Sequence, residues 1–157
     1  MTIERASGAG AEPGPLPPFE TPLAILPGDV DELGHVNNVV YLRWIQELAI
    51  AHWNSGTTTD ERAALVWVVA RHEVDYERPV LPGDAVIGRT WIGAQVGRHF
   101  ERLCEIVRGA DGRRFAKSRT LWCPIDPATG RTCRVPDSIR ARFSTGVAPG
   151  AERPAGA

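Results

Sequence analysis

The segment Asn38–Ser55, NVVYLRWIQELAIAHWNS, carries the strongest helical pattern in the sequence and decides the fold. Asn37 and Asn38 are residue types that begin helices well, and Gly56 follows at the position where a helix would stop. Apolar residues occupy nearly the whole circumference of this helix, and such a distribution is typical of a buried helix. The helix would be about 27 Å long, which is comparable with the width of a small domain. We therefore expect it to lie in the middle of the molecule.

Alternation of apolar and polar residues predicts strands on both sides of this helix. The expected strands cover residues 19–26, 65–78, 84–96, 98–108 and 113–123. Gly109–Gly112, between the last two, has the composition of a hairpin turn. A short terminal helix is expected over Asp137–Phe143. One strand, a buried helix and an antiparallel meander predict an α+β fold in which one antiparallel sheet wraps around one long central helix.

Strict alternation also predicts which side chains face the helix. In the strand over residues 65–78, the expected inner set is Val66, Val68, Ala70, His72, Val74 and Tyr76. His72 is therefore expected either as a hydrogen-bonded core residue or as part of a site. In the strand over residues 113–123, Ala116, Ser118 and Thr120 share a face, and their small side chains would let a helix approach closely.

Composition narrows the class of protein. The 157 residues suffice for one domain, and 18 Lys and Arg against 19 Asp and Glu give a formal charge of −1. This balance argues against nucleic acid or an anionic membrane as the main partner. No apolar run approaches the ~20 residues of a membrane helix, and the first residues lack the pattern of a secretory signal. Three cysteines without metal-ligand spacing predict a reduced, cytoplasmic protein.

The two ends of the chain differ in composition from its middle. Residues 1–18 and 144–157 are rich in Gly, Ala and Pro, and they contain too little apolar area to offset the entropy lost on ordering. We therefore expect a disordered leader over residues 1–18, one folded domain over residues 19–143 and a disordered tail over residues 144–157.

The densest polar cluster, PGDVDELGHVNN at residues 27–38, lies directly before the predicted helix. Gly, Asp and Asn are common where loops enter helices, so a purely structural role stays open. The first turn of a helix also presents N–H groups and a partial positive charge, which suit a developing oxyanion. A carboxylate a few residues earlier could act on the carbon whose oxygen these groups hold, and acyl transfer requires this pairing.

The string DVDELGHVNNVVYLRW, Asp29–Trp44, closely resembles the hotdog-fold acyl-CoA thioesterases of the 4-hydroxybenzoyl-CoA thioesterase type. The resemblance continues through VDYERPVLPGD (Val74–Asp84) and DPATGR (Asp126–Arg131), so it covers essentially residues 19–143. It implies a hotdog fold and hydrolysis of an acyl-CoA thioester to a free acid and CoA, with no cofactor and no metal. It also implies a homodimer, or a homotetramer of such dimers, in which the edge strand containing Leu65–Val74 pairs with its copy and each active site lies at the subunit boundary.

The same resemblance assigns catalytic roles. The second Asp of the D-x-D pair, Asp31, matches the catalytic carboxylate, a nucleophile or general base, and the backbone N–H of Asn38 matches the group that holds the thioester carbonyl. His35 resembles the catalytic His of the plant acyl-carrier-protein thioesterases. Those enzymes have an Asn two residues before that His, whereas this chain has Leu33. His35 is therefore a secondary candidate, with ordering of the loop as its alternative role.

Several residues are candidates for binding substrate. They are Gly34, Tyr41, His72, Arg98, Lys117 and Arg119. The three basic residues are of the type that could bind the phosphates of CoA, although a solvated strand face is the default explanation for Lys117 and Arg119. The five tryptophans could narrow a pocket toward short or aryl acyl groups, or they could serve packing alone.

Two other functions stay open at this point. The first is hydrolysis of acyl groups carried by acyl carrier protein, and the second is acyl binding without turnover. A serine hydrolase is not supported, because Ser118-Arg119-Thr120 lacks the glycines of a nucleophile elbow.

Overall fold

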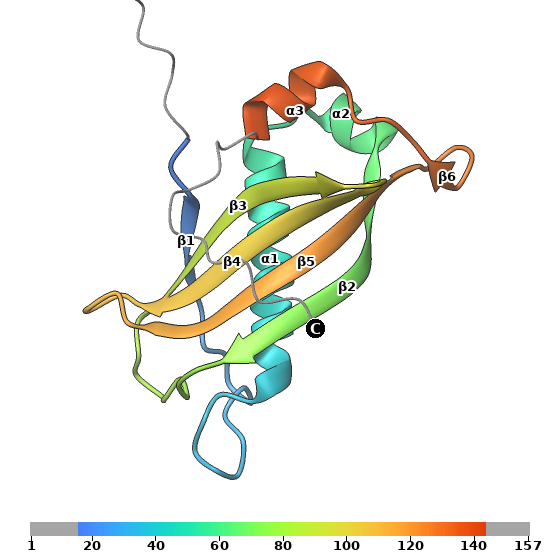
Figure 1. Ribbon diagram of the computed structural model, residues 1–157. Helices are drawn as coiled ribbons and strands as arrows, with labels where there is room; N and C mark the ends of the chain where they lie inside the picture. The colour runs from blue at the N-terminus through green and yellow to red at the C-terminus, as the bar shows by residue number, and fades with distance from the viewer. Residues whose placement is uncertain (1–15, 144–157) are drawn as a thin grey trace, which may run out of the picture.

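The computed structural model describes residues 16–143, and Figure 1 shows that part of the chain as one curved sheet lying across one long helix. The strands are β1 (Phe19–Leu23), β2 (Val66–Tyr76), β3 (Val86–Val96), β4 (His99–Arg108), β5 (Arg114–Asp126) and β6 (Arg131–Thr132). The helices are α1 (Asn38–Ser55), α2 (Thr59–Ala64) and α3 (Asp137–Phe143). Apart from residues 16–18, the predicted leader lies outside the described residues, as does the predicted tail.

The sheet is antiparallel throughout, with the strand order β1-β3-β4-β5-β2 and β6 paired with the end of β5. The α+β architecture predicted from the sequence is confirmed, but the predicted meander is limited to β3, β4 and β5. Strand β2 pairs with β5 instead of β3 and forms one edge of the sheet. None of the helices within residues 16–143 is long and apolar enough to cross a membrane.

Helix α1 has the boundaries that its sequence predicts. Asn37 is the N-cap, and its side-chain oxygen accepts a hydrogen bond from the N–H of Val39 at 3.0 Å. Its buried residues face the sheet, and these are Val40, Tyr41, Trp44, Ile45, Leu48 and Ala49. The opposite side is open in the single chain, where Val39 is 67% exposed and Leu42 and Ile50 are also exposed. The expectation of a helix buried all round is therefore met on one side only.

Strand β1 is shorter than predicted, because the chain turns away from the sheet after Leu23. The carbonyl oxygen of Ala24 accepts a hydrogen bond from Nε1 of Trp44 at 3.0 Å. The N–H of Leu26 is bonded to the Asp29 carboxylate at 2.7 Å. Helix α2 was not predicted, although Thr58 and Glu61 form a capping box whose T-x-x-E spacing is visible in the sequence.

A β-bulge in β2 overturns the predicted face of that strand. The pairing with β5 shifts between Val69 and Arg71. His72 lies opposite Thr120 on the inner face, as expected, whereas Val66 and Val68 lie on the outer face. An extra residue inverts the alternation of side chains, so no strictly alternating pattern could place both ends of this strand correctly.

The core has two parts that correspond to the two halves of α1. The larger cluster packs the first half of α1 against the middle of the sheet, with Tyr41, Trp44, Ile45 and Phe115 among its buried members. The smaller cluster joins the far end of α1 to α3 and to Leu65, which follows α2, and its buried residues are Leu65, Val135, Ile139 and Phe143. Gly56 permits this packing, because a Cβ there would lie 2.5 Å from the Phe143 ring.

Candidate active site

The polar cluster before α1 folds into a tight hairpin at the lower end of the helix in Figure 1. The N–H of Asp31 donates to the carbonyl of His35 at 2.8 Å, and the N–H of Asn37 donates to the carbonyl of Asp29 at 2.8 Å. Gly34 occupies the turn with a φ of +77°, a backbone conformation that side chains other than glycine rarely adopt. The hairpin therefore holds Asp31 and the start of α1 on one short, rigid segment.

The two aspartates of the D-x-D pair have different surroundings. Asp29 is only 6% exposed, and both of its carboxylate oxygens accept hydrogen bonds from the Arg43 guanidinium, at 2.8 and 2.7 Å. The hydrogen bonds from Arg43 hold the pKa of the Asp29 carboxyl below its usual range, despite its burial. Asp29 thus ties the hairpin to α1 and has no free oxygen for chemistry.

Asp31 is half-buried and less constrained. Its Oδ1 accepts one hydrogen bond, from the N–H of Leu33 at 2.9 Å, and it makes no ion pair with any residue in the range 16–143. The N–H of Asn38 belongs to the unpaired first turn of α1, and its carbonyl accepts a hydrogen bond from the Tyr76 hydroxyl at 3.0 Å. Of the two aspartates, Asp31 is therefore the one with a carboxylate oxygen available near the start of the helix.

Two other predicted site residues in this region have structural partners. His35 contributes its backbone carbonyl to the hairpin, and its side chain makes no hydrogen bond or ion pair within the described residues. Tyr41 is buried, and its hydroxyl accepts a hydrogen bond from the N–H of Val80 at 3.2 Å. Burial raises the pKa of the Tyr41 phenol. The contacts of Tyr41 are those of a core residue, and its role in binding substrate stays a prediction.

The remaining candidates lie on the sheet and are not gathered around Asp31. His72 is on the inner face, where its Nδ1 lies 2.9 Å from the hydroxyl of Thr120, and burial lowers its pKa. Lys117 lies 4.0 Å from Asp75, and Arg119 pairs with Glu73 at 3.7 Å and with Glu101.

Arg98 is exposed in the β3–β4 turn. That turn lies at the end of the sheet remote from the hairpin. The roles of these four residues in substrate binding stay predictions.

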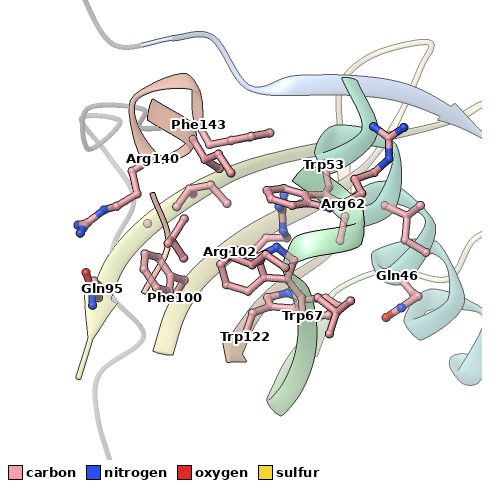
Figure 2. Close-up of a pocket in the computed structure, with 18 residues that line it drawn as sticks. Gln46, Trp53, Arg62, Trp67, Gln95, Phe100, Arg102, Trp122, Arg140 and Phe143 are labelled. Carbon is pink, nitrogen blue, oxygen red and sulfur yellow. The ribbon is translucent and has the colours of Figure 1, made fainter. Parts of the chain in front are cut away.

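A cavity of about 290 Å³ lies at the other end of α1, between the helix, the inner face of the sheet and α3 (Figure 2). Three of the five tryptophans line it, namely Trp53, Trp67 and Trp122. Trp44 belongs to the core, and Trp91 is half-buried outside the cavity. Asp31 does not line this cavity in the single chain.

The sequence interpretation missed Arg102, which lines the cavity from β4. Its signal was present, because Arg102 interrupts the otherwise apolar inner set formed with Phe100, Cys104 and Ile106. Within the described residues, no group of three or more His, Cys, Asp or Glu side chains is arranged to hold a metal ion.

Comparison with known proteins gives consistent results. Residues 25–143 match the family model of the thioesterase-like superfamily. A thioesterase from Thermus thermophilus, solved with coenzyme A and Zn, is 28% identical, with a TM-score of 0.68 over 79% of this chain and 90% of that chain. A predicted thioesterase from Bacillus stearothermophilus is 26% identical, with a TM-score of 0.69 over 80% of this chain and 93% of that chain.

A more distant relative is the chloroplastic palmitoyl-acyl carrier protein thioesterase of Gossypium hirsutum, 25% identical over 108 residues. That match includes 63% of this chain but only 26% of the longer cotton protein. The hotdog fold and the thioesterase resemblance predicted from Asp29–Trp44 are confirmed by these likenesses. The chain belongs to the thioesterase-like superfamily.

Proposed function

We propose that this protein hydrolyses an acyl-CoA thioester to the free acid and CoA, with Asp31 as nucleophile or general base. The observation that carries the proposal is the contrast within the D-x-D pair. Asp29 is saturated by Arg43, whereas Asp31 keeps a carboxylate oxygen without a partner within residues 16–143 and lies just before the first amides of α1. The N–H of Asn38 is the proposed oxyanion donor, and neither the Asn38 side chain nor a metal is required.

Hydrolysis needs only one carboxylate and one oxyanion donor, because the carbonyl carbon of a thioester is already activated toward attack and the thiolate leaves readily. In one route, an Asp31 oxygen attacks the carbonyl carbon, the Asn38 N–H stabilises the oxyanion, and the thiolate leaves to give a mixed anhydride that water then hydrolyses. In the other route, Asp31 takes a proton from water as that water attacks the same carbon. Both routes end with the acid and the thiol, and both need Asp31 ionised.

A homodimer formed through β2 is part of the proposal. Strand β2 is an edge of the sheet, and the apolar residues Val66 and Val68 are exposed on it. Antiparallel pairing of two β2 edges about a two-fold axis sets the Tyr76 end of one copy beside the Val66 end of the other. Because Tyr76 contacts Asn38, and Trp67 beside Val66 lines the cavity, each hairpin then faces the cavity of the second copy.

Coenzyme A is the proposed thiol carrier. The Thermus thioesterase with bound coenzyme A is similar over nearly its whole length, whereas the cotton acyl-carrier-protein enzyme is matched over about a quarter. The cotton relative makes acyl carrier protein the second candidate. Rates measured on the same acyl group attached to CoA and to acyl carrier protein would separate the two carriers.

The cytoplasm is the proposed location. Cys104, Cys123 and Cys133 are all free thiols, and the first two are buried. Unpaired thiols are expected in a reducing compartment. Fractionation of cells that produce the full chain, followed by detection of the protein, would test this location.

The experiment for the catalytic role replaces Asp31 by Asn in the full chain. We expect kcat/KM for a hydrolysed acyl-CoA to fall by about 10² or more, because this substitution removes the proton acceptor or nucleophile. Glu32→Gln is the matched control, since Glu32 is an exposed carboxylate in the same hairpin, and it should retain activity. Unchanged kcat/KM in Asp31→Asn, with circular dichroism like that of the parent, would remove Asp31 from the mechanism.

A further inference from the structure

The cavity at the far end of α1 contains a buried positive charge without a counter-charge. Arg102 is 6% exposed, and no carboxylate within residues 16–143 pairs with it. Its Nη1 donates to Nδ1 of His52 at 3.0 Å and to the hydroxyl of Thr90 at 3.1 Å, and both partners are neutral. A buried guanidinium normally has an acidic partner, because removing its charge from water costs several kcal/mol.

The local environment keeps this charge uncompensated. Burial, together with the charge of Arg102, lowers the pKa of His52 to about 4, so the imidazole is neutral at physiological pH and accepts the hydrogen bond. Burial also lowers the pKa of Arg102, to about 10, which leaves the guanidinium protonated. The Thr90 hydroxyl donates to the Leu103 carbonyl at 2.9 Å and can offer Arg102 only a lone pair.

A second unused donor lines the same cavity. Nε1 of Trp122 is buried and has no hydrogen-bond acceptor within the described residues. Trp122 pairs with Phe100 and Arg102 pairs with Thr120, so Trp122 and Arg102 are diagonal neighbours on the inner face of β4 and β5. Figure 2 shows Arg102 among the rings of Trp53, Trp67 and Trp122. Two neighbouring residues of the cavity wall therefore carry buried donors, and both donors lack the anionic or carbonyl oxygen that would satisfy them.

The other residues that line the cavity favour a ligand with an apolar middle and an acidic group at one end. Aromatic rings form one continuous wall. The ring centroids of Trp53 and Trp67 are 5.7 Å apart and those of Trp67 and Phe100 are 5.4 Å apart, and both pairs meet edge to face. Arg62 and Arg140 also line the cavity, whereas no Asp or Glu does. A volume of about 290 Å³ holds roughly ten non-hydrogen atoms, if each takes about the space of one water molecule.

We propose that this cavity receives a short acyl group carrying a second carboxylate at its distal end, bound by Arg102 with Trp122 Nε1 as an additional donor. This inference rests on the proposed thioesterase function and names its substrate class. A purely aliphatic chain would leave the Arg102 charge and the Trp122 N–H unsatisfied against methyl groups. A carboxylate satisfies both, while its apolar linker packs on the rings of Trp53, Trp67 and Phe100.

The kinetic test compares two CoA thioesters of the same shape. Glutaryl-CoA has the distal carboxylate, and 5-methylhexanoyl-CoA replaces it by an isopropyl group; 4-carboxybenzoyl-CoA and 4-isopropylbenzoyl-CoA form an aromatic pair. We expect the full chain to favour the carboxylated member in kcat/KM by about 10- to 100-fold, the range for hydrogen bonds to a charged group. Arg102→Met should abolish this preference by lowering kcat/KM for the carboxylated member, and Trp122→Phe should reduce it.

Arg113→Met is the matched control, because Arg113 is exposed beside the β4–β5 hairpin turn and its side chain makes no ion pair with a described residue. It should keep the preference. Arg102→Met should also fold with an unchanged or higher Tm, because it removes an uncompensated buried charge. If Arg102→Met nevertheless fails to fold, Arg102→Lys, which keeps the charge but loses the planar guanidinium, should show a weakened preference.

Direct binding separates this inference from the catalytic proposal. Glutarate and terephthalate should quench tryptophan fluorescence of the parent and not of Arg102→Met, whether or not any thioester is hydrolysed. Binding of these acids without turnover of any acyl-CoA would overturn the catalytic proposal and, with it, the assignment of an acyl group. Turnover that ignores the distal carboxylate would overturn the present inference alone. Arg102-dependent binding of free acids with Arg102-independent kinetics would also overturn the assignment to the acyl group.

Discussion

A buried charged residue lies near each end of α1, but only the one near the beginning of the helix has an oppositely charged partner. At its beginning, Asp29 is enclosed by Arg43 and by the N–H of Leu26, so every strong acceptor on the carboxylate is used. At its far end, Arg102 is equally buried but meets only neutral side chains and an open cavity. The compensated pair holds the fold together, whereas the uncompensated cation is available to a ligand.

The same two ends also differ in packing. Trp44 is completely buried in the larger cluster and donates a hydrogen bond to Ala24. Trp53 borders the cavity and is packed on fewer sides. A closely packed region beside the hairpin that contains Asp31 is thus combined with a hollow region beside Arg102.

The largest effect on the free energy of unfolding should come from replacing Trp44, in the closely packed first half of α1. Trp44→Ala is expected to lower the free energy of unfolding by about 3–5 kcal/mol, because it creates a cavity and leaves the Ala24 carbonyl without its donor. Trp53→Ala should cost less, since one face of that ring already borders empty space. Urea denaturation of both variants measures the difference, and equal losses would contradict the contrast between the two ends.

In the proposed dimer, the Asp31 hairpin of one copy acts together with the cavity of the second copy. A charged side chain introduced on the β2 edge would test this arrangement by weakening the dimer. Val68 is 52% exposed there, and Val68→Lys would introduce a charge without a partner among the apolar side chains of the proposed interface. We expect the dimer Kd to rise by about 100-fold or more, with loss of activity at concentrations where the chain becomes monomeric. Val96→Lys, at an exposed apolar position on β3, is the control. Sedimentation velocity of both variants gives the result, and a dimeric Val68→Lys would exclude this interface.

The smallest effect is expected for Asp29, whose charge is paired with Arg43, and its contribution to the free energy of unfolding depends on pH. Asp29→Asn should lower the free energy of unfolding by about 1.5–3 kcal/mol at neutral pH, because charged hydrogen bonds to Arg43 are lost. The folded pKa of Asp29 is depressed, so its contribution is present above the unfolded value near about pH 4 and is lost as the pH falls through the folded pKa. The two proteins should therefore converge in stability in acid. A difference that stayed constant down to about pH 2 would assign the loss to packing instead.

The local pattern predicted much of the fold because its signals are independent of distant residues. Asn37, the apolar residues of α1 and Gly56 specified a helix with the observed ends. Turn composition at Gly109–Gly112 specified the hairpin between β4 and β5. The bulge between Val69 and Arg71 could not be predicted in this way, because it depends on how β2 aligns with β5.

The candidate site was predicted less completely. The string around Asp31 directed attention to the hairpin, but both aspartates of the D-x-D pair are chemically alike in the sequence. Only the fold brings Arg43 onto Asp29 and leaves Asp31 less engaged. Arg102 was missed because a charged residue in a strand ordinarily faces solvent, and the curvature of the sheet around α1 decides that this one faces a cavity.

The sequence by itself determined the long helix, the positions of the main strands along the chain and the motif before the helix, since these depend on residue types within a few positions of one another. The tertiary structure decided which aspartate is saturated, which edge of the sheet is open and which buried cation has no partner. Those properties arise from residues far apart in the chain, and compensation of a charge depends on its neighbours in space.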